Sequence, residues 1–225
     1  MTPDAGPAER WSLGQRRLYL CTPLRPDFER FASACLDGGV DVVQLRDKDL
    51  DDEETVRVAT LLRKVCADHG APFLLNDRPD LAATAGADGV HVGQDDEAPE
   101  VARALVGDEA LVGLSTHSPS ELDEAIGRGA PVDYVSAGPV VPTPTKPGRA
   151  GTGVGYVTFA TSRADWPVWI TGGVVPETVP ALVAAGARHF VVVRWLTEAD
   201  DPQARAHALR RAIDESIEAI ESSGR

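Results

Sequence analysis

The stretch GADGVHVGQDD, residues 86–96, contains the unit that decides the fold. A glycine is followed by a short apolar segment, and polar and acidic residues come directly after it. The glycine and its apolar segment recur in GGVDVV (38–43), GAPVDYV (129–135) and GARHFVVV (186–193). Helices commonly end at a glycine in the left-handed conformation, so each copy predicts a helix that leads into a buried strand. The predicted helix-ending glycines are Gly39, Gly86, Gly129 and Gly186.

Strand and helix patterns alternate along the rest of the chain. Apolar runs predict strands at 16–22, 40–47, 71–77, 87–93, 110–116, 132–140, 167–173 and 188–195. Segments with helical periodicity or helix-end signals predict helices at 27–39, 51–70, 78–86, 97–107, 118–130, 176–187 and 201–223. Near-continuous apolar strands that alternate with helices are typical of a parallel sheet, and eight units predict a barrel. We therefore expect an α/β protein, a single (β/α)8 TIM barrel over residues 16–222, with residues 1–15 as an N-terminal extension that need not be ordered.

An open doubly wound sheet is the alternative fold. It usually carries a glycine-rich fingerprint after its first strand, and LYLCTPLRPDF (18–28) has none. The glycine-rich segment GTGVG (151–155) follows a loop instead of a strand, and no Walker A sequence is present. The barrel is therefore the favoured fold.

Composition narrows the classes of partner. A net charge of −13 argues against nucleic acid, although it leaves small anionic ligands open. Three cysteines without a C-x-x-C pair are typical of a reducing cytoplasm. No signal peptide or membrane-spanning run is visible, and the histidines lack the spacing of zinc ligands. We expect a cytoplasmic protein with no membrane partner; a homo-oligomer is compatible with this composition.

Polar residues gather at the predicted carboxyl ends of the strands, where the active sites of such barrels lie. Arg46, Lys48 and Lys146 suit phosphate oxygens, and Asp77 and Asp96 suit Mg²⁺. Each residue also has a structural interpretation, because acidic residues after strands often form turns and arginines often form ion pairs at the rim. The presence of such groups at successive strand ends favours a binding site for an anionic substrate and a metal.

The loop VVPTPTKPGRAGTG (140–153) follows the sixth predicted strand. Its three prolines exclude a helix and a central strand. The hydroxyls of Thr143 and Thr145 and the cation of Lys146 suit anionic groups, and the later glycines leave the far half free to close as a lid. The adjacent Gly172 and Gly173, after the seventh strand, suit a phosphate held by backbone N–H groups.

Taken together, these motifs resemble the thiamine-phosphate synthase family over about residues 17–215. The segments that carry the resemblance are VVQLRDKDL (42–50), FLLNDRPDLAATAGADGVHVGQDD (73–96), VGLSTHS (112–118), GPVVPTPTKPG (138–148), ITGGV (170–174) and AGARHFVVVRWLTEADDP (185–202). The resemblance implies a (β/α)8 enzyme that needs Mg²⁺. It implies that 4-amino-2-methyl-5-(diphosphooxymethyl)pyrimidine is joined to 4-methyl-5-(2-phosphooxyethyl)thiazole, giving thiamine monophosphate and pyrophosphate.

The resemblance also implies roles for individual residues. The residues expected to contact the pyrimidine diphosphate are Gln44, Leu45, Arg46, Asp47, Lys48, Asn76, Ser115 and Lys146. The expected catalytic groups among them are Arg46, Lys48, Ser115 and Lys146. The Mg²⁺ ligands fall on Asp77 and Asp96. The residues expected to bind the thiazole phosphate are Thr143, Pro144, Thr145, Gly173, Val193 and Arg194.

Two positions depart from the family pattern. Arg194 stands where the family often has serine, so its side chain either binds the phosphate or blocks the site. Asp47 replaces a usual glutamate that is one methylene longer. Two other functions use the same kind of barrel: a thiazole phosphate tautomerase and a non-catalytic thiamine-phosphate-binding regulator. Neither needs both the carboxylates and the cations named above, so the expected function is the transferase, which works through a dissociative, carbocation-like step.

Overall fold

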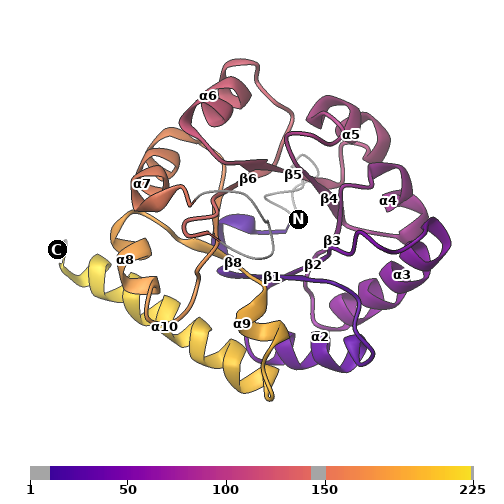
Figure 1. Ribbon diagram of the computed structural model, residues 1–225, viewed down its shortest axis with the longest axis horizontal. Helices are drawn as coiled ribbons and strands as arrows, with labels where there is room; N and C mark the ends of the chain where they lie inside the picture. The colour runs from indigo at the N-terminus through magenta and orange to yellow at the C-terminus, as the bar shows by residue number, and fades with distance from the viewer. Residues whose placement is uncertain (1–10, 143–150, 224–225) are drawn as a thin grey trace.

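The computed structural model describes residues 11–142 and 151–223. Its eight parallel strands pair in chain order and close into a barrel, and helices surround this ring (Figure 1). The strands are β1 (Leu18–Thr22), β2 (Val42–Leu45), β3 (Phe73–Asn76), β4 (Gly89–Val92), β5 (Leu111–Thr116), β6 (Tyr134–Ala137), β7 (Val168–Thr171) and β8 (His189–Val192). The predicted (β/α)8 barrel is thereby confirmed.

The helices pack on the outside of the barrel. They are α2 (Phe28–Asp37), α3 (Asp52–Asp68), α4 (Pro79–Ala85), α5 (Pro99–Val106), α6 (Pro119–Gly127), α7 (Gly153–Arg163), α8 (Val179–Ala184), α9 (Arg194–Thr197) and α10 (Pro202–Ser223). None of the described helices is both long enough and apolar enough to cross a membrane.

Two helices were not predicted. Glycine and β-branched residues give α7 a low intrinsic helix propensity, and packing of Tyr156, Val157 and Ala160 into the core stabilises it instead. The last strand was predicted to run to Trp195, but β8 ends at Val192 and the short helix α9 follows it. The four predicted helix-ending glycines are confirmed in the positive-φ region, with φ of 102° at Gly39, 67° at Gly86, 61° at Gly129 and 99° at Gly186.

Side chains alternate between the two faces of every strand. The outward-facing residues, such as Leu18 and Leu20 of β1, form the main core between the strands and the helices. The inward-facing residues form a second core in one half of the barrel interior, made of Leu13, Tyr19, Val42, Leu74, Leu111, Tyr134 and Trp169. The other half of the interior is lined by polar inward-facing residues, and it leads to the carboxyl ends of the strands.

Residues 11–15 differ from the expectation of a separate extension. Leu13 lies in a short 3-10 helix (Leu13–Gln15), is 1% exposed and packs in the interior core with Tyr19. Arg16 fixes this segment, because its guanidinium donates to the carbonyls of Trp11 (2.8 Å) and Asp41 (2.6 Å). The folded unit therefore begins before residue 16. Residues 1–10 lie outside the described residues.

His189 gives the stability of the barrel a dependence on pH. Its Nδ1–H donates to the carbonyl of Arg16 at 2.6 Å, and burial lowers the pKa of the ring from 6.5 to about 4. Below pH 6.5 the unfolded chain takes up a proton that the folded chain does not, so stability falls as the pH falls from 6.5 toward 4. We expect His189 alone to lower the free energy of unfolding by about 2 kcal/mol when the pH is lowered from 7.5 to 5.

Urea unfolding of the wild type and of His189→Gln at both pH values measures this difference. The loss of stability on acidification should be smaller in His189→Gln by that amount. His207→Gln, at an exposed histidine of α10, is the matched control and should keep the wild-type pH dependence. The same acid destabilisation in His189→Gln as in the wild type would assign the effect to other groups.

Candidate active site

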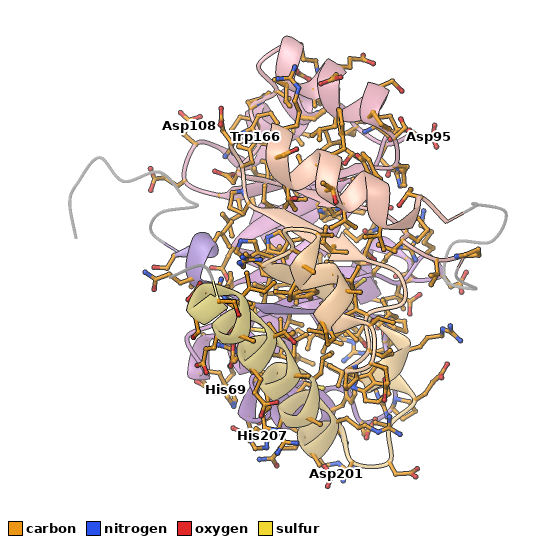
Figure 2. The ribbon with its side chains drawn as sticks, turned by 90° about the vertical axis from the view of Figure 1, so that its left-hand side faces the viewer. His69, Asp95, Asp108, Trp166, Asp201 and His207 are labelled. Carbon is orange, nitrogen blue, oxygen red and sulfur yellow. The ribbon has the colours of Figure 1, made fainter. Side chains whose placement is uncertain are left out.

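A cavity of about 910 Å³ lies at the carboxyl ends of the strands. Asp95, which follows β4, and Asp108, which precedes β5, lie at opposite ends of the barrel, and only Asp95 lines the cavity (Figure 2). Residues from all eight strands or the loops after them contribute to its wall. The predicted site residues that line it are Gln44, Arg46, Asp47, Lys48, Asn76, Asp77, Asp96, Ser115, Gly173, Val193 and Arg194.

The remaining predicted site residues do not line this cavity in the described part of the chain. Leu45 is 2% exposed and packs outward in the main core, so its side chain is not part of the cavity wall. Thr143, Pro144, Thr145 and Lys146 lie outside the described residues. The described ends of their loop meet beside the cavity, where the Gly153 amide donates to the Val140 carbonyl at 3.0 Å.

Two carboxyl groups, those of Asp77 and Asp96, face each other at the ends of β3 and β4. Asp77 has a φ of 58°, a strained conformation for a residue with a side chain, and its amide donates to the His91 carbonyl at 2.9 Å. Burial and the hydrogen-bonded, like-charged carboxyl of Asp96 raise the pKa of Asp77, against the opposing effect of Lys48. The Lys48 ammonium lies 3.4 Å from the Asp77 carboxylate.

This pair suits a divalent cation. Mg²⁺ takes oxygen ligands, and it commonly uses one or two carboxylates together with water and substrate phosphates. The described residues contain no group of three or more His, Cys, Asp and Glu side chains placed to hold a metal. The donor set is therefore two carboxylates, which leaves further ligand positions for phosphate oxygens. A cation there would relieve the repulsion that raises the pKa of Asp77.

Two arginines contribute positive charge to the cavity wall. Arg46 is half-buried and Arg194 is exposed, and neither guanidinium has a hydrogen-bond or ion-pair partner among the described residues. Arg46 therefore forms no ion pair at the rim with a described residue, which removes the structural interpretation of this arginine within that part of the chain. Arg78, in contrast, does not line the cavity and pairs with Asp52 and Asp80, each at 2.7 Å.

Asp47 lines the cavity but is engaged by the backbone. Its carboxylate accepts from the amides of Leu24 (3.1 Å) and Asp49 (3.0 Å), so it ties the loop after β1 to the turn after β2. The shorter side chain at this position therefore has a turn-forming role.

The loops after β7 and β8 form the wall beside Arg194. Gly172 and Gly173 have φ of 86° and 77°, and a side chain on them would collide with Pro139 and Val141 respectively. Only glycine fits both restrictions. Both glycines line the cavity, and consecutive residues in such turns are a common way to bind an anion through backbone N–H groups.

A row of hydrogen-bonded side chains connects the predicted site residues Gln44 and Ser115, and the sequence analysis missed its two tyrosines. Gln44 donates to Tyr19 (2.8 Å), whose hydroxyl contacts that of Tyr134 (3.1 Å). Tyr134 contacts Nδ1 of His91 (3.0 Å), and Nε2 of His91 contacts Ser115 (2.9 Å). All five are inward-facing strand residues, so alternation within each strand was the signal that would have found them.

The sequence and the fold are both similar to those of known proteins. The family model described as "Thiamine monophosphate synthase" matches residues 18–196. A thiamine-phosphate synthase of Mycobacterium sp. (strain KMS) is 43% identical over 221 residues, covering 92% of this chain and 95% of the relative. One from Thermobifida fusca (strain YX) is 44% identical over 208 residues, covering 91% and 95%. Among solved structures, thiamine phosphate pyrophosphorylase from Pyrococcus furiosus superposes with a TM-score of 0.81 at 27% identity, covering 90% of this chain and 98% of that one.

The facing carboxyl groups give a prediction about protonation. Replacing Asp96 by Asn removes the like charge beside Asp77, so we expect the pKa of Asp77 to fall in Asp96→Asn. Titration of the Asp77 side-chain carboxyl carbon by NMR measures this change in the metal-free protein. Asp108→Asn, at the opposite end of the barrel, is the control and should leave it unchanged. An unaltered Asp77 titration in Asp96→Asn would show that the two carboxyls do not interact.

Proposed function

The chain belongs to the thiamine monophosphate synthase family, and from this membership we propose how its residues serve the reaction. The protein condenses 4-amino-2-methyl-5-(diphosphooxymethyl)pyrimidine with 4-methyl-5-(2-phosphooxyethyl)thiazole, which gives thiamine monophosphate and pyrophosphate. The observation that best supports a diphosphate site is that the carboxyl pair of Asp77 and Asp96 shares one cavity wall with Arg46, whose guanidinium has no partner in residues 11–142 and 151–223.

The pyrimidine diphosphate occupies the side of the cavity formed by β2 to β5 in this proposal. Arg46 and Lys48 bind its phosphate oxygens, and the resemblance adds Lys146. Gln44, Asn76 and Ser115 surround the organic part, and their positions in the cavity wall support this assignment. Leu45 contributes through its backbone only, since its side chain faces the helices.

Mg²⁺ is the proposed cofactor, held by Asp77 and Asp96. When bound, it supplies positive charge to the diphosphate, whose oxygens complete its ligand set. Lys48, at 3.4 Å from Asp77, lies where it contacts both the carboxylate and a diphosphate oxygen. This arrangement uses the two acidic residues in their charged form, which a neighbouring cation favours.

The thiazole phosphate occupies the opposite wall, at the loops after β7 and β8. Backbone N–H groups at Gly173 and Val193 and the guanidinium of Arg194 bind it, and the resemblance adds Thr143, Pro144 and Thr145. The Arg194 side chain is exposed and has no partner in the part of the chain that the structure describes, which supports a direct contact in place of the family's usual serine.

The chemistry requires little covalent participation by the protein. The pyrimidine amino group donates electrons toward the exocyclic methylene, so the C–O bond breaks with the electron pair leaving on the diphosphate. The thiazole nitrogen then attacks the cationic methylene. Arg46 and Lys48 stabilise the charge that develops on the leaving group, and the two walls of the cavity hold the partners in line.

An assay of both products tests this proposal. Purified protein with both substrates and Mg²⁺ should release pyrophosphate and thiamine monophosphate in equal amounts. Asp96→Ala should reduce kcat/KM by about 100-fold or more, because it removes a metal ligand. Asp108→Ala is the control and should behave like the wild type. Binding of the thiazole phosphate without formation of either product would contradict the transferase.

Arg194 gives a separate prediction. If its guanidinium binds the thiazole phosphate, Arg194→Ser should raise the KM for that substrate roughly tenfold while the KM for the pyrimidine diphosphate stays unchanged. Arg211→Ser, on an exposed arginine of α10 outside the cavity, should change neither KM. A lower KM for the thiazole phosphate in Arg194→Ser would show that the arginine obstructs the site.

A further inference from the structure

Five inward-facing side chains cross the barrel interior as one hydrogen-bonded row, which we call the interior chain: Gln44, Tyr19, Tyr134, His91 and Ser115. They come from β2, β1, β6, β4 and β5, and all are buried, with Tyr134 only 1% exposed. Gln44, Tyr19, His91 and Ser115 line the cavity, whereas Tyr134 does not.

Counting donors gives the interior chain a direction. The Gln44 amide nitrogen has only protons to give, so the Tyr19 hydroxyl accepts from it at 2.8 Å. Tyr19 then uses its single proton on the Tyr134 hydroxyl (3.1 Å), and Tyr134 uses its own on Nδ1 of His91 (3.0 Å). Accepting at Nδ1 leaves the neutral ring protonated at Nε2, which donates to Ser115 at 2.9 Å.

The direction decides what Ser115 offers to a ligand. Its oxygen accepts from His91 at 2.9 Å and more weakly from the Ser136 hydroxyl at 3.4 Å. A serine hydroxyl has one proton, and no hydrogen bond within the described residues uses the hydroxyl proton of Ser115. It is therefore available to an acceptor atom in the cavity.

We propose that Tyr134 is a positioning residue that, through the Nε2–H tautomer of His91, sets Ser115 as a hydrogen-bond donor to the pyrimidine diphosphate. This inference rests on the proposed function for the identity of the ligand. The orientation of the interior chain itself is a property of the protein without substrate.

Three features hold the interior chain in this state. Burial raises the pKa of both Tyr19 and Tyr134, so both hydroxyls keep their protons. The Sγ–H of Cys21 donates to the Gln44 carbonyl oxygen at 3.0 Å, which fixes the amide orientation from which the direction starts. Gly113 leaves room for the Tyr134 ring, because a methyl group there would overlap it.

Packing beneath the interior chain restricts the two tyrosine rings. The Trp169 ring meets Tyr19 edge to face at 5.3 Å and Tyr134 at 6.4 Å between centroids. Tyr134 also stacks on the His91 ring at 5.5 Å. The hydroxyls therefore have few other positions to adopt.

The tautomer of His91 is the first measurement. Long-range ¹H–¹⁵N NMR of the substrate-free protein distinguishes the protonated ring nitrogen from the bare one, and His91→Gln assigns the signal. We expect a bare Nδ1 and a protonated Nε2 in the wild type, and a loss of this single state in Tyr134→Phe. Tyr156→Phe is the matched control, because its buried hydroxyl donates to Thr116 at 2.7 Å outside the interior chain. A protonated Nδ1 in the wild type would overturn the proposed direction.

Steady-state kinetics then tests whether Tyr134 acts through Ser115. We expect Tyr134→Phe to lower kcat/KM for the pyrimidine diphosphate roughly tenfold and to leave the KM for the thiazole phosphate unchanged. In the Ser115→Ala background the same substitution should have no further effect, since the group it positions is gone. Tyr156→Phe should keep wild-type kinetics. Equal effects of Tyr134→Phe with and without Ser115 would overturn the positioning role and indicate general destabilisation.

The two experiments separate failure of this inference from failure of the proposed function. The NMR measurement needs no substrate, so an inactive wild-type protein with the expected His91 tautomer would contradict the proposed function alone. An active protein in which Ser115→Ala has no effect would overturn the donor role of Ser115.

Discussion

Closure of the barrel is the constraint on which the rest of the structure depends. β1 pairs with β2 on one side and with β8 on the other, so none of the eight described strands has an unpaired edge. Closure directs every second side chain into a narrow interior and brings eight carboxyl strand ends to one rim. The cavity, its facing carboxyls and its glycine turns all follow from that convergence of segments far apart in the sequence.

Local sequence patterns are enough to predict much of the fold. Glycines in the left-handed conformation separate helices from strands, and the apolar runs are distinct enough to locate all eight strands. The exceptions depend on tertiary contacts that no local pattern contains. Helix α7 is built from weak helix formers and exists because Tyr156 and its neighbours pack inward. Leu13 is ordered because the barrel interior accepts its side chain.

In the candidate site, too, some residues could be predicted from the sequence and others could not. Strand-end residues such as Asp77 and Arg46 were predictable, because a parallel barrel brings all its carboxyl ends together. The two tyrosines of the interior chain were not, because Tyr19 and Tyr134 count as apolar in runs that have the pattern of uniformly buried strands. Only the assignment of faces, residue by residue, separates them from Leu18 and Val135 beside them. The hydrogen bonds from backbone amides to the Asp47 carboxylate also could not be predicted from the sequence, since one of the donors, the Leu24 amide, lies in another loop.

Helix α10 packs against both α2 and α8, and so joins the last part of the chain to the first (Figure 1). The β1–β8 pairing makes the same connection within the sheet. During synthesis from the N-terminus, β1 and α2 therefore emerge long before their partners do. The β1 edge that pairs with β8 therefore stays open in the nascent chain until β8 has been synthesised.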